Sequence, residues 1–415
     1  MMRATKDSGF EWIGIIPTEW GLSKIGQVYR LRNTKVSDTD YPPLSVTNKG
    51  IVPQLDTAAK TNAHDDRKLV KKGDFAINSR SDRRGSCGIS DYDGSVSLIN
   101  TILAPLNEMN PGYYDWLFHT VQFGDEFYKF GHGIVDDLWT TGWQEMKKIT
   151  IPTPPLPEQQ HIADFLDAKC AEIDALVADI QTQIVTLEQY KRSVITETVT
   201  NGLDPNAEMK DSGVQWIGDT PAHWGVIRGK YILRYMQKPV RENDGVITCF
   251  RDGEVTLRSN RREDGFTMSD KEIGYQGIDV GDLVVHGMDG FAGAIGISDS
   301  RGKASPVLNV LDTDQCKRYI MYYLRSMAYS DVFLALATGI RVRSCDLRWN
   351  KLAELSYPVP PLDEQNAIVK HIDSVLSKAD AVIADKKAQL ATLDEYKKSL
   401  IFEYVTGKKE VPCID

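Results

Sequence analysis

Basic and amide side chains gather at corresponding places in the two halves of the chain, each group beside predicted strands. The first group consists of Asn48, Lys49, Asn78, Arg80, Arg83 and Arg84. The second group consists of Arg251, Arg258, Arg261, Arg262, His286, Arg341 and Arg343. Arginine pairs bidentately with guanine edges and with phosphates, and asparagine pairs with adenine. A single arginine is more simply a solvated or ion-paired surface group. The clustering after matched strands in both halves favours duplex DNA as the ligand.

The sequence shows no self-contained catalytic site. The glycine-rich stretch 291–296 matches neither a dinucleotide fingerprint nor a Walker loop, and is better interpreted as tight turns on a strand. Residues 41–44 lack the polar residue with which an amino-methyltransferase motif would hold its target amine. The six cysteines include no Cys-x-x-Cys pair, which argues against a zinc site and for a reducing compartment. We therefore expect a non-catalytic chain without a metal or cofactor of its own. A self-contained methyltransferase or nuclease, and a coiled-coil scaffold that binds only proteins, remain as alternatives.

The elements that must position these side chains are repeated. Residues 6–21 return as residues 210–225, with the shared pattern Lys-Asp-Ser-Gly-x-x-Trp-Ile-Gly. We interpret the tryptophans of this segment as packing residues. In each half, a strand–turn–strand pattern, at 43–52 and again near 247–255, is followed by further short strands. An aromatic-rich helix is predicted at 113–130 and again at 319–337.

Two long helices follow the repeated halves. Pro155-Leu156-Pro157-Glu158-Gln159 launches the first helix, and Pro361-Leu362-Asp363-Glu364-Gln365 launches the second. Apolar residues recur at heptad spacing, which predicts a coiled coil. The seam residues expected are Ile173, Leu176, Ile180, Leu187 and Tyr190 in the first helix, and Val382, Leu393 and Tyr396 in the second. Because a whole domain separates the helices, we expect them to pair antiparallel.

This order predicts an α+β fold, with two similar mixed α/β domains and two long helices that form an antiparallel coiled coil. The predicted boundaries are 1–151 for the first domain, 152–203 for the first helix, 204–357 for the second domain, and 358–415 for the second helix and tail. The 415-residue chain has a net charge of -9, so any nucleic-acid surface must be local or shared with a partner. No run is apolar enough for a membrane span and no secretory signal is visible, so we expect a cytoplasmic protein.

The doubled Lys-Asp-Ser-Gly-x-x-Trp-Ile-Gly segments and the Pro-Pro-Leu-x-Glu-Gln helix starts resemble the specificity subunit of type I restriction-modification enzymes. The resemblance covers essentially the whole chain. It implies two target-recognition domains, each of which reads one half of a split DNA sequence, with the coiled coil setting the gap and docking methyltransferase subunits. It also implies a restriction subunit with translocase and nuclease activities. S-adenosylmethionine, ATP and magnesium would belong to those partners.

Overall fold

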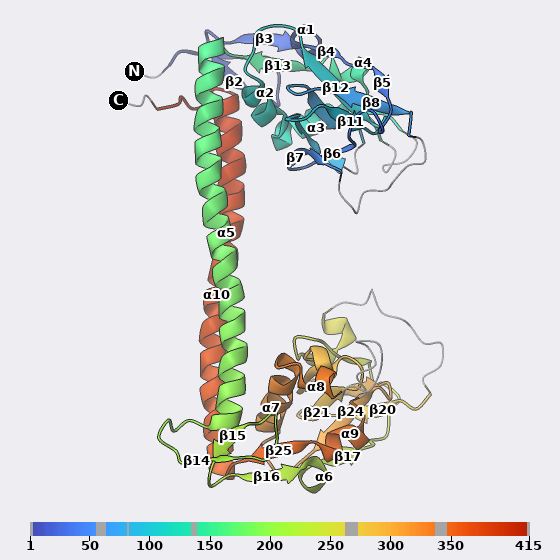
Figure 1. The fold of residues 1–415 in the computed structure, drawn as a ribbon, viewed down its shortest axis with the longest axis vertical. Coiled ribbons are helices and arrows are strands. Elements are labelled where there is room, and N and C mark those ends of the chain that lie inside the picture. The colour runs from blue at the N-terminus through green and yellow to red at the C-terminus, as the bar shows by residue number, and fades with distance from the viewer. Residues whose placement is uncertain are drawn as a thin grey trace. The chain divides into compact units, whose positions relative to one another are not determined.

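The computed structural model describes residues 3–54, 64–80, 83–133, 139–261, 273–336 and 347–412. The chain forms two compact units, which contain the elements labelled in Figure 1. Unit 1 comprises Met1–Ile180 and Lys387–Asp415, and unit 2 comprises Gln181–Lys386. Each unit thus holds one mixed α/β part together with a part of each long helix. The division predicted at residues 151, 203 and 357 treats the helices as separate domains, and it stays a prediction.

The strands described in unit 1 form short antiparallel ladders. They are β1 (Thr5–Asp7), β2 (Ile15–Pro17), β3 (Gly21–Lys24), β4 (Tyr29–Leu31), β5 (Lys35–Val36), β6 (Leu44–Thr47), β7 (Gly50–Pro53), β8 (Arg67–Val70), β9 (Phe75–Asn78), β10 (Cys87–Ile89), β11 (Gly94–Val96), β12 (Asn100–Pro105) and β13 (Thr150–Thr153). The short helices of this unit are α1 (Ile25–Val28), α2 (Pro111–Phe118), α3 (Val121–Lys129) and α4 (Trp143–Met146). The larger sheets have the strand orders β10-β9-β12-β4 and β11-β8-β5.

Unit 2 has the same plan. Its strands are β14 (Met209–Asp211), β15 (Asp219–Pro221), β16 (Gly225–Arg228), β17 (Arg234–Met236), β18 (Ile247–Cys249), β19 (Val255–Leu257), β20 (Gln276–Ile278), β21 (Leu283–His286), β22 (Ile295–Ile297), β23 (Gly302–Ala304), β24 (Leu308–Asp312) and β25 (Ser356–Val359). Its short helices are α6 (Gly229–Ile232), α7 (Lys317–Tyr329), α8 (Val332–Ala335) and α9 (Trp349–Glu354), with the 3-10 turns η3 (Arg258–Asn260) and η4 (Gly290–Ala292). The main sheet has the order β17-β24-β21-β22.

The main sheet and the hairpin of the two units repeat each other. The order β17-β24-β21-β22 matches β4-β12-β9-β10, and the hairpin β18–β19 matches β6–β7. In each unit, the strand that leads into a long helix pairs with a strand near the start of the globular part: β13 with β3, and β25 with β16. The predicted α+β fold with an internal repeat is confirmed.

The prediction of one aromatic helix per unit is wrong, because each is interrupted. In unit 1 the Thr120 hydroxyl accepts the backbone N–H of Phe123 at 3.2 Å, which caps α3 and separates it from α2. In unit 2, Asp331 has a φ of 54° between α7 and α8, a backbone conformation that a continuing helix excludes. On both sides of each break aromatic side chains still enter the core: Phe118 and Phe123 are buried in unit 1, and Tyr323 and Phe333 are buried in unit 2.

The tryptophans of the repeated segment are packing residues, as predicted. Trp20 and Trp224 are each 1 % exposed, and Trp12 is 9 % exposed. Trp20 lies edge-on to Tyr113 with ring centroids 6.4 Å apart, which is a favourable arrangement for aromatic rings. The segment therefore joins the core of its own unit.

The two long helices are α5 (Leu156–Asn201) and α10 (Leu362–Val405). Their first-turn glutamates accept indole N–H bonds, from Trp20 to Glu158 at 2.8 Å and from Trp224 to Glu364 at 3.1 Å. Negative charge in the first turn also suits the helix dipole. The repeated segment of each unit is thereby fixed to the start of the long helix that follows the globular part of that unit. Among the described residues, no helix combines the length and apolarity needed to cross a bilayer.

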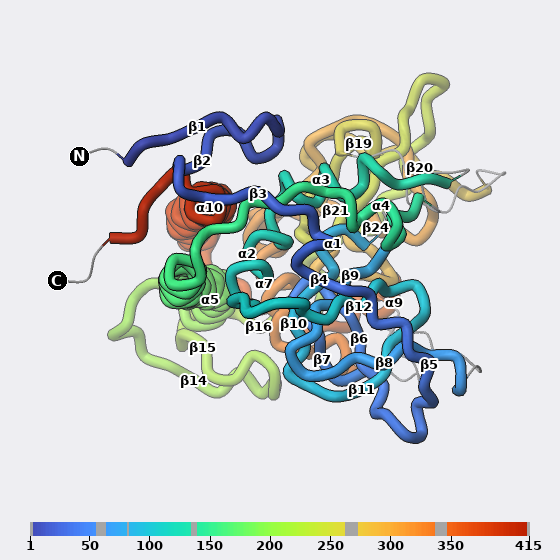
Figure 2. Tube along the Cα trace, turned by 90° about the horizontal axis from the view of Figure 1, so that it is seen from above, coloured from blue at the N-terminus to red at the C-terminus, as the bar shows by residue number. Residues whose placement is uncertain are grey.

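Within each unit, α5 and α10 pack antiparallel, as predicted, and Figure 2 shows the two helices in adjacent positions. In unit 1 the cross-helix pairs include Phe165 with Tyr404, at 4.5 Å between ring centroids, and Asp174 with Lys397, at 2.6 Å. In unit 2 they include Lys191 with Asp380, at 2.6 Å, and Gln183 with Lys386. In both units, the residue numbers of the contacting pairs rise along α5 as they fall along α10, so the two helices run antiparallel.

The predicted seam residues divide into three groups by exposure. Ile173 and Ile180 are buried, at 8 % and 5 % exposed. Leu187 and Leu393 are half-buried. The exposed members are Leu176 (47 %), Tyr190 (50 %), Val382 (44 %) and Tyr396 (53 %). A two-helix pair covers only a narrow stripe of each helix, so these four apolar side chains lie outside the seam.

Tyrosine hydroxyls tie the globular part of each unit to the end of the long helix that finishes there. In unit 1, the Tyr113 hydroxyl donates to the carbonyl oxygen of Val405 at 2.8 Å. In unit 2, the Tyr319 hydroxyl lies 3.0 Å from the carbonyl oxygen of Val199. The last carbonyls of a helix have no partner within it, so each hydroxyl satisfies a group that would otherwise be buried and unpaired. Burial raises the pKa of both phenols well above the ordinary value, so both remain hydrogen-bond donors.

Glycine ends both helices. Gly202 follows α5 with a φ of +77°, and Gly407 follows α10 with a φ of +69°. Glycine adopts this left-handed conformation without strain. At Gly407 a Cβ would also lie 2.4 Å from the Pro17 side chain, so the close approach of the β2 end requires glycine there.

Candidate nucleic-acid interface

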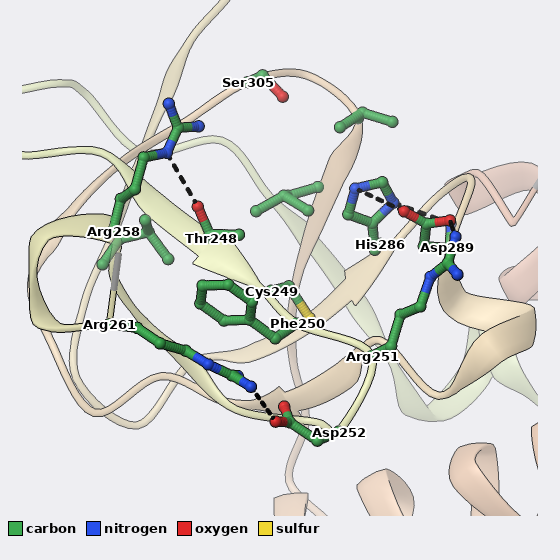
Figure 3. Close-up of a pocket in the computed structure, with 13 residues that line it drawn as sticks. Thr248, Cys249, Phe250, Arg251, Asp252, Arg258, Arg261, His286, Asp289 and Ser305 are labelled. Carbon is green, nitrogen blue, oxygen red and sulfur yellow. Dashed lines mark hydrogen bonds and ion pairs between the residues drawn. The ribbon is translucent and has the colours of Figure 1, made fainter. Parts of the chain in front are cut away.

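A hollow of about 710 Å³ opens beside the β18–β19 hairpin of unit 2 (Figure 3). It brings together the four described members of the second predicted group: Arg251, Arg258, Arg261 and His286. These residues come from the hairpin turn, from η3 and the residue after it, and from the end of β21. The convergence that the matched strand positions predicted is therefore present in this unit.

Arg261 is held flat in the hollow. Its guanidinium carbon lies 4.2 Å from the centroid of the Phe250 ring. The Arg261 terminal nitrogens contact Asp252 at 2.7 Å and Glu254 at 3.0 Å. Burial raises the pKa of Asp252, but the bond and charge of Arg261, together with backbone N–H bonds such as that from Glu254, outweigh it and leave the pKa of that carboxyl below its ordinary value. The stacked ring and two carboxylates fix the guanidinium plane and neutralise its charge.

Arg251 and His286 meet at Asp289. The Arg251 Nη2 atom donates to Asp289 Oδ1 at 2.8 Å. The His286 Nδ1 atom accepts two backbone N–H groups, from Met288 at 3.2 Å and from Asp289 at 2.9 Å. Burial lowers the pKa of His286, and the Asp289 carboxylate opposes this shift only in part. The ring is therefore neutral at pH 7, with its proton on Nε2, where it can donate.

Arg258 extends along the hairpin. Its Nε atom lies 3.4 Å from the Thr248 hydroxyl, and Figure 3 draws its two terminal nitrogens beyond that contact. Cys249 is buried below the hairpin, and burial raises the pKa of its thiol. The thiol therefore remains protonated.

In unit 1 the corresponding hairpin turn, between β6 and β7, carries Asn48 and Lys49. Both side chains are exposed. This turn is the counterpart of the β18–β19 turn, which carries Arg251. The two units thus present different side chains, an amide and an ammonium against a guanidinium, at the same place in the same fold.

An arginine held by an aromatic ring and a carboxylate is also present in unit 1. The Arg84 guanidinium carbon lies 5.0 Å from the Tyr128 ring centroid, and its Nη1 atom donates to Asp125 at 2.8 Å. The Tyr128 hydroxyl in turn donates to the Arg80 carbonyl at 3.0 Å. Arg83, close by in sequence, is exposed. As with Arg261, an aromatic face and a carboxylate orient the arginine at the surface.

Asn78 and His286 occupy equivalent positions, because each is the last residue of its strand, β9 or β21. Asn78 is 6 % exposed, and its Oδ1 atom accepts the backbone N–H of Arg80 at 3.1 Å. Each side chain therefore supports the turn that follows its strand. A base contact by Asn78 requires this turn to open, and that contact stays a prediction.

Some predicted residues cannot be placed. Arg262, Arg341 and Arg343 lie outside the described residues. Conversely, sequence reasoning missed Phe250, Asp252 and Asp289, which hold the arginines of the hollow. The aromatic-Arg-Asp-Gly order of residues 250–253 was an available signal for a shaped turn, whereas Asp289 is joined to Arg251 only by tertiary structure.

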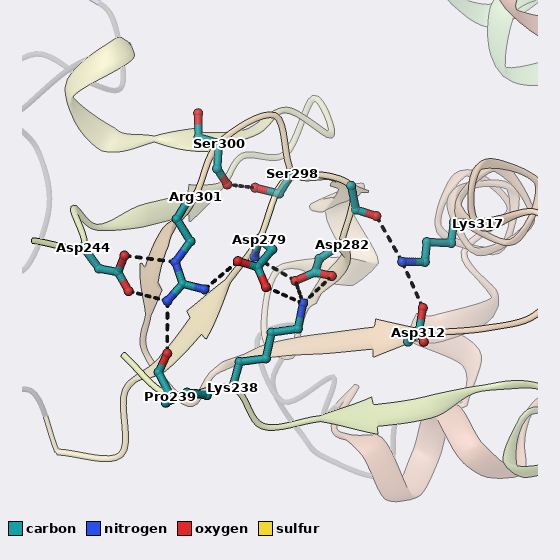
Figure 4. A network of polar contacts seen from close by, with 11 residues as sticks. Lys238, Pro239, Asp244, Asp279, Asp282, Ser298, Ser300, Arg301, Asp312 and Lys317 are labelled. Atoms are coloured by element: carbon teal, nitrogen blue, oxygen red, sulfur yellow. Dashed lines mark hydrogen bonds and ion pairs between the residues drawn. The ribbon is translucent and has the colours of Figure 1, made fainter. Parts of the chain in front are cut away.

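An ion-pair network fixes the base of this hairpin (Figure 4). Arg301 bonds Asp244, just before β18, at 2.7 Å and Asp279 at 2.6 Å. Lys238 bonds Asp279 at 2.8 Å and Asp282 at 2.7 Å. The Lys238 and Arg301 bonds lower the pKa of Asp279 to about 2. Five alternating charges thereby link three segments that support the hollow. No group of His, Cys, Asp and Glu in the described ranges could hold a metal ion.

Comparison with known proteins points to one family. Residues 17–185 match the family model described as the type I restriction modification DNA specificity domain. The putative type I restriction enzyme MjaX specificity subunit of Methanocaldococcus jannaschii is 25 % identical over 281 residues, which are 64 % of this chain and 61 % of that protein. The MjaVIII specificity subunit of the same organism is 24 % identical over 341 residues, or 77 % of this chain and 76 % of that protein. The chain thus spans about three-fifths of the first relative and three-quarters of the second.

Two solved structures share the fold. A chain from a study of complex assembly and conformational transition in the type I R-M system has a TM-score of 0.70 at 13 % identity, covering 95 % of this chain and 99 % of that one. The HsdS subunit from Thermoanaerobacter tengcongensis has a TM-score of 0.53 at 15 % identity, covering 97 % of this chain and 100 % of that one. The architecture of nearly the whole chain is therefore that of these proteins.

Proposed function

We propose that this chain, which belongs to the family of type I restriction-modification specificity subunits, recognises a split sequence in double-stranded DNA. Each unit reads one half of the sequence. The observation that carries the proposal is the repeated hairpin, β6–β7 and β18–β19, which in each unit lies against corresponding strands of the main sheet, β9 and β10 or β21 and β22. In unit 2 this hairpin borders the hollow where arginines from separate segments converge. Equivalent loops with different side chains suit two readers with different half-sites.

The long helices supply the spacing. α5 has 46 residues and α10 has 44 residues, so each is roughly 65–70 Å long at a rise of 1.5 Å per residue. A stiff helix pair makes the separation of two half-sites a geometric property. Binding at one half-site also raises the effective concentration of the second reader at its own half-site.

In this proposal the catalytic steps are carried out by partner subunits. In this proposal methyltransferase subunits dock on the helices and the repeated segments, and a restriction subunit with translocase activity joins them. Those subunits bind S-adenosylmethionine, ATP and magnesium, while this chain is non-catalytic. The exposed apolar side chains Leu176, Tyr190, Val382 and Tyr396, outside the helix seam, are candidates for partner contact.

The net charge of the chain, -9, supports a shared DNA surface. Neutralising phosphates requires cationic side chains and dominates non-specific affinity. An acidic reader needs partner subunits to provide part of that cationic surface. We expect the isolated chain to bind DNA weakly. Tight, salt-insensitive binding by the isolated chain contradicts this part of the proposal.

The function is tested by mapping methylated bases genome-wide in cells with and without this gene. The proposal predicts a split sequence motif that is methylated in the presence of the gene and unmethylated after its deletion. Restoring the gene should restore the same motif. If deletion leaves every methylated motif in place, the recognition function is refuted.

A further inference from the structure

We propose that Arg251, oriented by Asp289, reads a guanine in the half-site bound by unit 2. The inference rests on the proposed function, because it requires unit 2 to meet a duplex. It adds the base that is selected and the side chain that selects it.

The position of Arg251 suits contact with a ligand. It lies in the turn of the β18–β19 hairpin, on the border of the hollow, and its side chain is 57 % exposed. In unit 1 the counterpart turn presents the exposed residues Asn48 and Lys49. The fold thus places changeable polar side chains at this turn in both units, as expected where two readers differ.

Asp289 orients Arg251 and leaves most of the guanidinium N–H donors available for a ligand. The bond from Arg251 Nη2 to Asp289 Oδ1, at 2.8 Å, uses one of the five N–H donors of a guanidinium. Asp289 is itself fixed, because its backbone N–H donates to His286 Nδ1 at 2.9 Å. The guanidinium plane is therefore oriented before binding, and the remaining donors can form a two-pronged contact.

The local charge favours a base over a phosphate. Asp289 neutralises Arg251, and Asp252 and Glu254 neutralise Arg261. Phosphate binding depends on excess positive charge, and these carboxylates would repel a phosphate. An uncharged base edge brings no such repulsion. The hollow is therefore better suited to base contact than to backbone contact.

The donor pattern selects guanine. Arginine carries donors and no acceptor. In the major groove, guanine presents two adjacent acceptors, N7 and O6, whereas adenine places an amino donor beside its N7. A two-pronged arginine contact is consequently satisfied by guanine alone among the four bases. The neighbouring Arg261 is engaged by two carboxylates and by the Phe250 ring, so it acts as a wall of the hollow.

The test uses the chain assembled with its methyltransferase subunits. The methylated motif of the wild-type complex is compared with that of R251K, which keeps the charge but loses the planar fork. Binding is then measured on four duplexes that differ at the affected base pair. Wild type should prefer G·C by roughly ten- to hundredfold, the range of a bidentate base contact. R251K should lose most of that preference while the other half-site stays unchanged.

D289N separates an orienting role from a merely structural one. Removing the carboxylate charge leaves Arg251 more cationic and less oriented. We expect lower selectivity at the same base pair, together with a salt dependence of binding that is steeper by about one phosphate contact. Arg228 provides a matched control, because its side chain is 58 % exposed and bonds one carboxylate, Glu354, at 2.6 Å outside the hollow. R228K should leave the motif unchanged.

The outcomes are distinct. If the wild-type complex methylates no split motif, the proposed function fails. If a split motif is present but R251K retains full selectivity at every base pair, the guanine contact is refuted and the function stands. Equal weakening on all four duplexes makes Arg251 a phosphate contact and also refutes the inference. Selectivity is a ratio of affinities, so the comparison remains valid for a variant that binds weakly or is partly unfolded.

Discussion

Replacing Tyr319 with phenylalanine removes a single hydroxyl from the junction between the globular part of unit 2 and the end of α5. Tyr319 is 0 % exposed, and its hydroxyl lies 3.0 Å from the carbonyl oxygens of both Val199 and Pro358. The variant leaves both carbonyls without this donor in a buried site. The cost of an unsatisfied buried polar group is about 1–3 kcal/mol. The phenyl ring remains, so the packing contribution changes little.

Equilibrium urea unfolding of the full chain measures this cost. Y319F should lower the free energy of unfolding of unit 2 by about 1–3 kcal/mol, and Y113F should do the same for unit 1. Tyr231 is a control of the same chemistry, because it is 75 % exposed. Y231F should change the free energy of unfolding by less than about 0.5 kcal/mol. If Y319F is as neutral as Y231F, the hydroxyl does not hold the helix end and the reasoning is refuted.

Three further predictions concern the hollow's support, the helix seam and unit 1. Lys238 helps lower the pKa of Asp279 to about 2. The ionised carboxylate therefore stabilises the fold above about pH 4, and this stabilisation is lost as the pH falls through about 2. D279N removes the titrating group, so the free energy of unfolding should fall less steeply with decreasing pH on the acid side. I180A should lower the free energy of unfolding measured in urea by about 2–5 kcal/mol. L176A should lower it far less, because the exposed fractions of Ile180 and Leu176 are 5 % and 47 %. Equal losses would contradict the assignment of Ile180 to the helix seam and of Leu176 to the exposed face. R84A should weaken binding of the assembled complex without changing its salt slope, because Asp125 neutralises Arg84 at 2.8 Å; a slope reduced by about one would instead show a phosphate contact there.

The sequence predicted most reliably what depends on local pattern. The proline-led starts at Leu156 and Leu362, and the buried positions Ile173 and Ile180, follow from turn chemistry and helical period. Leu176 and Tyr396 fit the same heptad equally well but lie outside the seam. A period cannot decide which edge of an apolar stripe its partner helix covers, because that depends on the angle at which the two helices meet.

In the candidate site, too, the sequence predicted the features set by local pattern and missed those set by tertiary contacts. Matched strand positions were enough to predict that Arg251, Arg258 and Arg261 gather in unit 2. They did not predict that Asp289 lies 2.8 Å from Arg251, because the pair is 38 positions apart in the chain, with the described strands β19, β20 and β21 between them. Nor did they predict that Asn78 is buried by its own turn. Ion pairs and burial are set by the tertiary fold, so sequence spacing carries little information about them.

The central claim is that the paired helices set the distance between the two half-sites. Gln183 and Lys386 contact each other across the pair, so four residues inserted after each would lengthen both helices at one level by about 6 Å. With DNA rising 3.4 Å per base pair, the gap in the methylated motif should lengthen by about one to two base pairs, while both half-site sequences stay the same. An unchanged gap in the methylation map, from a complex that still methylates, would contradict the account.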